Sequence, residues 1–353
     1  MNTYFLCITQ PYNLGDLIIN KMLIDELCKY GKVFVDIYNT PSNFASYLLK
    51  NDNAIDVYHK YGITVKRLKL WSLLKLIRKE KIQVYTTSPG PLEDPNFLVR
   101  KVLTFIEKFF LYHKVNIYPI GKCGSMMLYN NKIYKNSNIR HIYLRSQKSV
   151  EYINQNNHGI ASYMPDLAFL FRQYATINPS EKRICMTFRD MNNSAFRDKC
   201  IQMILACAVE GYTVDLFYQV ETDKLFMDYI YSHINHPNVH YRNQLLWYDE
   251  LNFYSGSSFV ISNRLHALIM GIVYNAVPIA FVHDHAKTIK IRDVFESIFT
   301  QEQLDNIYLN NDFSQNISET LSKANHSIGA IDTIAKELCK ECHNTIKALS
   351  SSY

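Results

Sequence analysis

Short apolar runs alternate with segments of helical periodicity along the first half of the chain. Strands are expected at residues 4–8, 33–37, 83–87, 115–120 and 139–144, and helices at residues 17–29, 42–50, 70–81, 99–113 and 149–154. This βαβα alternation predicts a parallel sheet that is covered by helices on both faces.

The alternation loosens over residues 157–178 and starts again after a polar stretch at residues 178–183. Strands are expected at residues 183–188, 213–218, 239–241, 259–262 and 278–281, and helices at residues 195–210, 223–232, 247–255 and 265–274. At 353 residues the chain is too long for one hydrophobic core. We therefore predict two doubly wound, Rossmann-like α/β domains, residues 1–178 and 179–353, facing each other across a cleft. We expect the C-terminal helix to pack back on the first domain.

Composition narrows the class of protein. Hydrophobic residues make up 48% and charged residues 20% of the chain, as is typical of a globular protein rather than a disordered one. The net charge of +6 favours anionic partners, but the basic residues are dispersed apart from residues 66–81, so we expect no binding to nucleic acid. The sequence shows neither a signal peptide nor an apolar run long enough to span a membrane, and we expect a cytoplasmic protein.

One basic segment has two interpretations. Residues 66–79 combine lysines and arginines with leucines at helical spacing and with Trp71. Such a helix can lie on an anionic lipid surface, which would bring the protein to the inner face of the membrane as a peripheral partner. The interpretation that we favour is a domain helix that packs its apolar stripe on the sheet and keeps its lysines in water.

The cysteines and histidines do not form a recognisable metal motif. Cys339 and Cys342 form a C-x-x-C pair, but His343 alone does not complete a zinc site, so thiols without metal are expected. Residues 283–285 read His-Asp-His, and on an extended segment only the two histidines would share one side. We expect neither a metal nor a cofactor.

The stretch from residue 259 to residue 271 carries the most chemical information. An apolar strand ends in the polar turn Ser262-Asn263, and a helix starts within two residues. Arg264 and His266 therefore lie at a helix N-terminus, where backbone N–H groups and the helix dipole favour an anion. Arg264 can fork two N–H donors onto a carboxylate or phosphate, and His266 can transfer a proton near neutral pH. A surface arginine and a helix-capping histidine are the alternative.

Several elements in this order resemble the polysaccharide pyruvyltransferase family. They are Asn13-Leu14-Gly15-Asp16 (N-x-G-D), Arg145-Ser146-Gln147-Lys148-Ser149 (R-x-x-x-S), Pro165-Asp166-Leu167-Ala168-Phe169 (P-D-x-A-F), Arg264-Leu265-His266-Ala267 (R-L-H-A), Val277-Pro278 and Lys287. The R-L-H-A element is fairly specific in this setting, whereas N-x-G-D alone is weak. The resemblance covers roughly residues 10–295, most of the chain.

The resemblance implies a GT-B-like fold and a transferase that uses phosphoenolpyruvate. It implies that Arg264 and Leu265 bind phosphoenolpyruvate and that His266 acts in acid–base catalysis. Arg189 and Lys287 match further positions expected to bind this substrate. The second domain would then hold phosphoenolpyruvate, and the first domain would hold a sugar or lipid-linked oligosaccharide acceptor used for capsule or exopolysaccharide synthesis.

The acceptor side is less well defined. Candidates on this side are Asn13, Gly15, Ser88 and Asp94. Family members commonly carry a Gly-Gly pair where this chain reads Ser88-Pro89-Gly90. Asp16 can cap the first helix, which we favour, or it can accept a proton from an acceptor hydroxyl as a catalytic residue.

Two other functions stay open. A GT-B glycosyltransferase that uses a nucleotide sugar would need a carboxylate for the ribose, and the second domain has no obvious glutamate in that place. A non-catalytic carbohydrate-binding protein of the same fold would not need to keep Arg189, Arg264 and His266 together.

Overall fold

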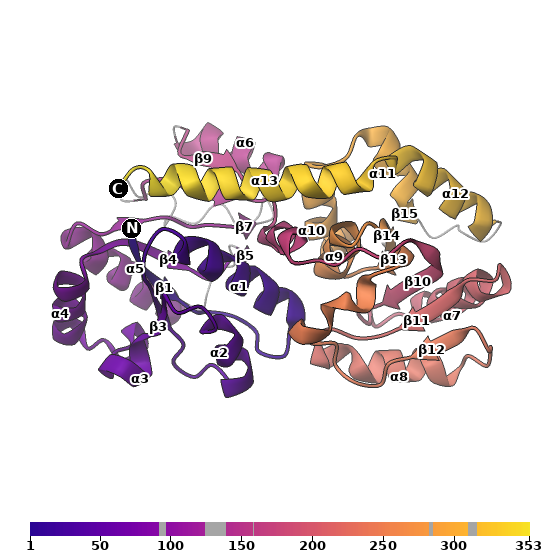
Figure 1. The fold of residues 1–353 in the computed structure, drawn as a ribbon, viewed down its shortest axis with the longest axis horizontal. Coiled ribbons are helices and arrows are strands. Elements are labelled where there is room, and N and C mark those ends of the chain that lie inside the picture. Colours follow the sequence, from indigo (N-terminus) through magenta and orange to yellow (C-terminus); the bar gives the residue numbers. More distant parts are fainter. Residues whose placement is uncertain (92–96, 124–138, 158, 282–284, 310–315) are drawn as a thin grey trace. The chain divides into compact units, whose positions relative to one another are not determined.

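The computed structural model describes residues 1–91, 97–123, 139–157, 159–281, 285–309 and 316–353. The chain forms two compact units (Figure 1). Unit 1 comprises residues 1–11, 16–167 and 340–353, and unit 2 comprises residues 12–15 and 168–339. A short piece of the N-terminal region, residues 12–15, therefore belongs to unit 2.

Unit 1 contains a five-stranded, all-parallel sheet with the strand order β3-β2-β1-β4-β6. Its strands are β1 (Asn2–Leu6), β2 (Val33–Asp36), β3 (Ala54–Asp56), β4 (Ile82–Thr87) and β6 (Asn116–Ile117). The helical segments of this part of the chain are α1 (Leu14–Cys28), α2 (Ser42–Leu48), α3 (Val57–Tyr61), η1 (Val65–Arg67), α4 (Leu70–Glu80), α5 (Phe97–Tyr112) and α6 (Gln147–Asn157).

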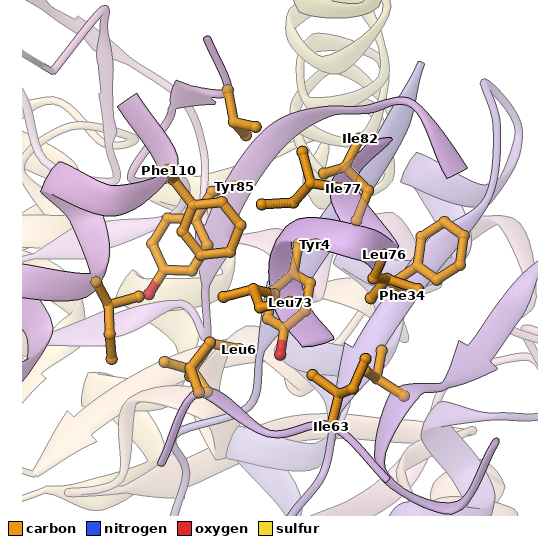
Figure 2. Packing of buried hydrophobic residues seen from close by; sticks show 14 of the residues in the cluster. Tyr4, Leu6, Phe34, Ile63, Leu73, Leu76, Ile77, Ile82, Tyr85 and Phe110 are labelled. Atoms are coloured by element: carbon orange, nitrogen blue, oxygen red, sulfur yellow. The ribbon is translucent and has the colours of Figure 1, made fainter. Parts of the chain in front are cut away.

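A buried cluster covers one face of this sheet (Figure 2). Tyr4 on β1 is the register partner of both Phe34 and Tyr85, so the three side chains point to the same face. Helix α4 adds Leu73, Leu76 and Ile77 to the cluster, and helix α5 adds Ile106 and Phe110. The rings of Tyr85 and Phe110 stack with centroids 4.4 Å apart (Figure 2). Helices α4 and α5 therefore cover the same face of the sheet, and the prediction of a domain helix within residues 66–79 is confirmed.

A second parallel sheet in the same unit was not predicted. Its four strands, in spatial order, are β5 (Gly90–Pro91), β7 (Lys122–Cys123), β8 (Ile142–Leu144) and β9 (Ala161–Tyr163). The long strand predicted at residues 115–120 is wrong beyond Ile117. Pro119 lacks the N–H group that a central strand needs, and its carbonyl instead accepts a hydrogen bond from Tyr143 N at 2.8 Å.

Unit 2 contains a six-stranded, all-parallel sheet with the strand order β12-β11-β10-β13-β14-β15. Its strands are β10 (Glu181–Thr187), β11 (Thr213–Leu216), β12 (Val239–Tyr241), β13 (Ser257–Ser262), β14 (Val277–Phe281) and β15 (Tyr308–Leu309). The first strand of the series lies in the middle, as in a doubly wound Rossmann sheet. The direction in which strands are added reverses between β10 and β13, and this reversal positions the site described below.

The connections of unit 2 are mostly helical, as predicted. They are η3 (Leu167–Gln173), α7 (Ser194–Val209), η4 (Glu221–Asp223), α8 (Lys224–Ser232), η5 (Tyr248–Tyr254), α9 (Leu265–Val273), α10 (His285–Phe295), α11 (Gln301–Ile307) and α12 (Ile317–Ile328). The α-helix predicted at residues 247–255 is instead the short 3₁₀ helix η5, a common form for a one- or two-turn connector. The predicted α/β class with two Rossmann-like halves is confirmed.

The last helix, α13 (Ile331–Ser350), begins in unit 2 and ends in unit 1. Its final part contacts unit 1 through Cys342, which donates to Pro165 O at 3.5 Å, and through His343, whose Nδ1 lies 2.9 Å from Glu26 Oε1. All eight cysteines are buried thiols. None of the described helices combines the length and the apolar character that crossing a membrane requires.

Candidate functional site

Two arginines lie side by side where the strand order of unit 2 reverses. Strands β10 and β13 are neighbours, and their last residues, Thr187 and Ser262, are register partners. Arg189 and Arg264 are each the second residue after their strand. The structure therefore brings these two predicted residues together at the edge where doubly wound sheets bind ligands.

Hydrogen bonds hold the two loops against each other. Asn263 Oδ1 accepts from Arg189 N at 2.7 Å, and Asn263 Nδ2 donates to Arg189 O at 2.9 Å. Ser262 Oγ donates to Thr187 O at 2.6 Å and accepts from Arg264 N at 2.9 Å. The backbones that carry both guanidinium groups are thereby fixed.

Arg264 is buried and forms a fork-like ion pair with Asp223, the last residue of η4. Its Nε donates to Asp223 Oδ2 at 2.8 Å, and its Nη2 bonds to Asp223 Oδ1. Only 9% of Arg264 and 2% of Asp223 are exposed. Burial raises the pKa of Asp223, and the adjacent Arg264 opposes that shift. Sequence reasoning missed Asp223, because a single aspartate before a helix is also the ordinary pattern of a cap.

Arg189 is exposed, and its guanidinium has no hydrogen-bond or ion-pair partner among the residues that the structure describes. Desolvation and the positive charge of Arg264 lower the pKa of the Arg189 guanidinium. Arg189 and Arg264 thus place two positive charges at the same edge of the sheet, and the single negative charge of Asp223 neutralises only one of them. An anion bound there would relieve the remaining repulsion.

The N-x-G-D loop packs against this site. Leu14 N donates to Gln219 O at 2.9 Å, and Glu221 N donates to Tyr12 O at 3.1 Å. Asn13 forms an antiparallel bridge with Val220. The loop is therefore part of unit 2, although its flanking residues belong to unit 1.

Gly15 brings the same loop onto His266, the second residue of α9. A Cβ atom built on Gly15 would lie 2.6 Å from His266 Cγ and 2.8 Å from His266 Cβ. Only a residue without a side chain allows this approach. His266 and Leu265 are half-buried, and Arg264 is the N-cap of the helix. The predicted residues Gly15, Arg264 and His266 are thus brought together.

The other predicted residues have further contacts or are not described. Asp16 lies in the first turn of α1, which begins at Leu14, so the prediction that it caps this helix is wrong. Its Oδ2 accepts from Gln10 N at 3.1 Å and from Thr9 Oγ1 at 3.2 Å. Ser88 is buried, and its Oγ accepts from Ile8 N at 2.8 Å. Asp94, His283 and Asp284 lie outside the described residues, as do the side chains of His285 and Lys287, which α10 carries.

A family model, polysaccharide pyruvyl transferase, matches residues 13–285. This span runs from the N-x-G-D loop through the R-L-H-A element. The chain belongs to the polysaccharide pyruvyl transferase family. A comparison with curated proteins finds no match.

Comparison with solved structures shows which fold this pyruvyl transferase family member has. The UDP-GlcNAc 2-epimerase from Neisseria meningitidis bound to UDP-GlcNAc is 11% identical, with a TM-score of 0.61 over all of both chains. The UDP-GlcNAc 2-epimerase from Methanocaldococcus jannaschii is 10% identical, with a TM-score of 0.58 over 92% of each chain. A glycosyltransferase from Rickettsia africae is 11% identical, with a TM-score of 0.55 over 98% of this chain and 93% of its own. The GT-B-like fold is therefore confirmed for this pyruvyl transferase family member.

Two further motifs of the pyruvyl transferase resemblance meet in unit 1. Arg145 of the R-x-x-x-S element forms a buried ion pair with Asp166 of the P-D-x-A-F element, and Arg145 Nη2 donates to Cys123 Sγ at 2.9 Å. Nearby, Lys122 Nζ donates to Thr87 Oγ1 at 2.9 Å. The sequence names Arg145 and Asp166 only as parts of two motifs and does not predict their pairing, because neighbouring strands such as the two-residue β7 are too short to show a period.

Burial shifts two acid–base groups beside this cluster toward neutral pH. Burial lowers the pKa of Lys122 to about 8, and the positive charge of Arg145 adds to the effect. Burial raises the pKa of Glu107 to about 7, although the charge of Lys122 opposes the rise. Over the part of the chain that is described, no three His, Cys, Asp or Glu side chains gather closely enough to hold a metal ion.

Proposed function

We propose that this chain transfers a pyruvyl group from phosphoenolpyruvate to two hydroxyl groups of one sugar, forming a cyclic ketal. The observation that carries the proposal is the pair Arg189 and Arg264 at the strand reversal of unit 2. Phosphoenolpyruvate carries a phosphate and a carboxylate, and both accept charge-assisted hydrogen bonds from guanidinium groups. Leu265 and, from α10, Lys287 are the further residues that we assign to binding this substrate.

The reaction follows from the charges and protons that must move. One sugar hydroxyl attacks C2 while C3 takes up a proton and becomes a methyl group. Inorganic phosphate then leaves, and the second hydroxyl attacks C2 and closes the ring. Of the two hydroxyl protons, one balances the proton taken up by C3 and the other leaves with phosphate. His266, beside Arg264, is the group that we assign to proton transfer, while Arg189 and Arg264 stabilise charge on the departing phosphate.

The acceptor that we propose is a sugar or lipid-linked oligosaccharide, a precursor of capsule or exopolysaccharide. We assign Asn13, Gly15, Ser88 and Asp94 to the acceptor side, with Asp16 as the acceptor for a hydroxyl proton. A lipid-linked acceptor would require the protein to work in the cytoplasm at the inner face of the membrane. The scheme needs no metal or cofactor.

The decisive experiment measures phosphoenolpyruvate binding and phosphate release with candidate glycan acceptors. The product should gain the mass of one pyruvate less one water. Arg189→Ala should weaken phosphoenolpyruvate binding by roughly tenfold or more, because it removes a charge-assisted contact worth about 1.5–3 kcal/mol. Arg197→Ala is the matched control, because that arginine pairs with Asp190 on the same unit. A protein that ignores phosphoenolpyruvate but consumes a nucleotide sugar would overturn the proposal.

A further inference from the structure

The outward sides of α4 and α5 carry large apolar side chains that the fold leaves in water. Both helices bury their opposite sides in the cluster of Figure 2. Trp71 on α4 is 79% exposed, and Phe105 and Tyr112 on α5 are 47% and 84% exposed. Large apolar groups gathered on one face of a water-exposed protein usually mark a contact surface.

Cations share a stripe with these aromatic residues on each helix. On α4, Trp71, Lys75 and Arg78 follow one another at intervals of four and three residues, which places them on one stripe.

On α5, the equivalent stripe has four members at the same intervals: Lys101, Phe105, Lys108 and Tyr112. All seven side chains of the two stripes are exposed, and none of the seven is acidic. We call these seven residues the aromatic–basic face.

We propose that the aromatic–basic face docks on the surface of an anionic lipid bilayer. Aromatic rings favour the headgroup level of a bilayer, and lysine and arginine can extend from the same helix to lipid phosphates and carboxylates. A second copy of this chain is a poorer occupant, because a symmetric contact would set the four cations of one copy against those of the other. The proposal does not depend on pyruvyl transfer, since vesicle binding needs neither phosphoenolpyruvate nor an acceptor.

The four positive charges set most of the expected affinity for anionic vesicles. Each lysine or arginine near an anionic surface strengthens partitioning by about fivefold, so loss of all four cations should weaken it by several hundredfold at low salt. Exposed charges are screened by salt, and wild-type binding should therefore fall when salt is raised.

The test is co-sedimentation of the whole chain with vesicles of phosphatidylcholine, with or without phosphatidylglycerol. The test variant carries Lys75→Gln, Arg78→Gln, Lys101→Gln and Lys108→Gln. The control carries Lys323→Gln, Lys336→Gln, Lys340→Gln and Lys347→Gln, which remove the same net charge from exposed positions on α12 and α13. Wild type and control should bind the vesicles that contain phosphatidylglycerol and not those of phosphatidylcholine alone. The test variant should bind neither kind.

Tryptophan emission supplies an independent readout. Trp247→Phe leaves Trp71 as the only tryptophan, and its emission should shift to the blue when anionic vesicles are added. Equal binding by the test variant and wild type, or no wild-type binding at low salt, would overturn the proposal. So would a dimer in lipid-free solution that the four substitutions convert to a monomer, because the face would then serve a second copy of the chain.

Discussion

Gly15→Ala tests whether the contact between the N-terminal loop and His266 matters for catalysis. The new Cβ would meet His266 Nδ1 first, and even His266 Cγ would lie only 2.6 Å away, about 0.8 Å short of the 3.4 Å at which ordinary contact begins. Either the imidazole or the loop must therefore move by at least about 0.8 Å. A displacement on the order of 1 Å near reacting atoms can cost roughly a hundredfold in rate.

The change in unfolding free energy of Gly15→Ala shows whether helix propensity or overpacking against His266 dominates. Gly15 lies within α1, and helix propensity alone would make alanine more stable by about 1 kcal/mol. Overpacking of the kind seen here costs about 1–3 kcal/mol. We therefore expect a net loss of roughly 0–2 kcal/mol, together with a fall in turnover of about a hundredfold.

The assay compares turnover, phosphoenolpyruvate affinity and unfolding by urea on the same preparations. Binding should change by less than about threefold, because Gly15→Ala leaves Arg189 and Arg264 in place. Gly62→Ala is the control, since Gly62 has a φ of +64° and open space where its Cβ would be. That change should cost about 1 kcal/mol of stability without lowering turnover. Wild-type turnover in a stabilised Gly15→Ala protein would refute the reasoning.

Two further predictions concern single side chains. His266→Ala should lower turnover by about 10²–10⁴-fold while phosphoenolpyruvate still binds, and a variant with near-normal turnover would remove this histidine from the mechanism. Glu107 has its pKa raised from 4.5 to about 7, so the stability that its proton provides is present below about pH 4.5 and is lost as the pH rises to about 7. Glu107→Gln should flatten that part of the pH dependence, by at most roughly 3 kcal/mol, when urea midpoints are compared at about pH 5 and pH 7.5; unchanged midpoints would contradict the assignment.

The position of the two arginines could be predicted from sequence alone, and the position of the N-terminal loop could not. Arg189 and Arg264 each follow an apolar run of strand length, and parallel strands bring such residues to one edge. The contacts of Asn13 with Val220 and of Gly15 with His266 join residues more than 200 positions apart. No local pattern encodes such pairings, so from sequence we assign the loop to the first domain, residues 1–178, together with its neighbours.

Short elements escaped prediction for a related reason. Strands β5 and β7 each have two residues, too few for any hydrophobic period to appear. The buried pair Arg145 and Asp166 depends on these strands and on β8 and β9, so its geometry could not be anticipated either. By contrast, α9 was predicted to within one residue, because an apolar strand, a polar turn and a continuous apolar helix follow one another in the sequence.

The membership of residues 12–15 in unit 2 has a consequence for how the protein is made. During synthesis these residues leave the ribosome early, whereas Gln219, Val220 and Glu221, which bond to them, follow some 200 residues later. At about 5–20 residues per second the loop waits roughly 10–40 s for its partners. Any folding of helix α1 in this interval takes place without the hydrogen bond from Leu14 N to Gln219 O. The contact of Gly15 with His266 therefore cannot form until residue 266 has left the ribosome, and a nascent chain that stops before residue 266 cannot assemble this site.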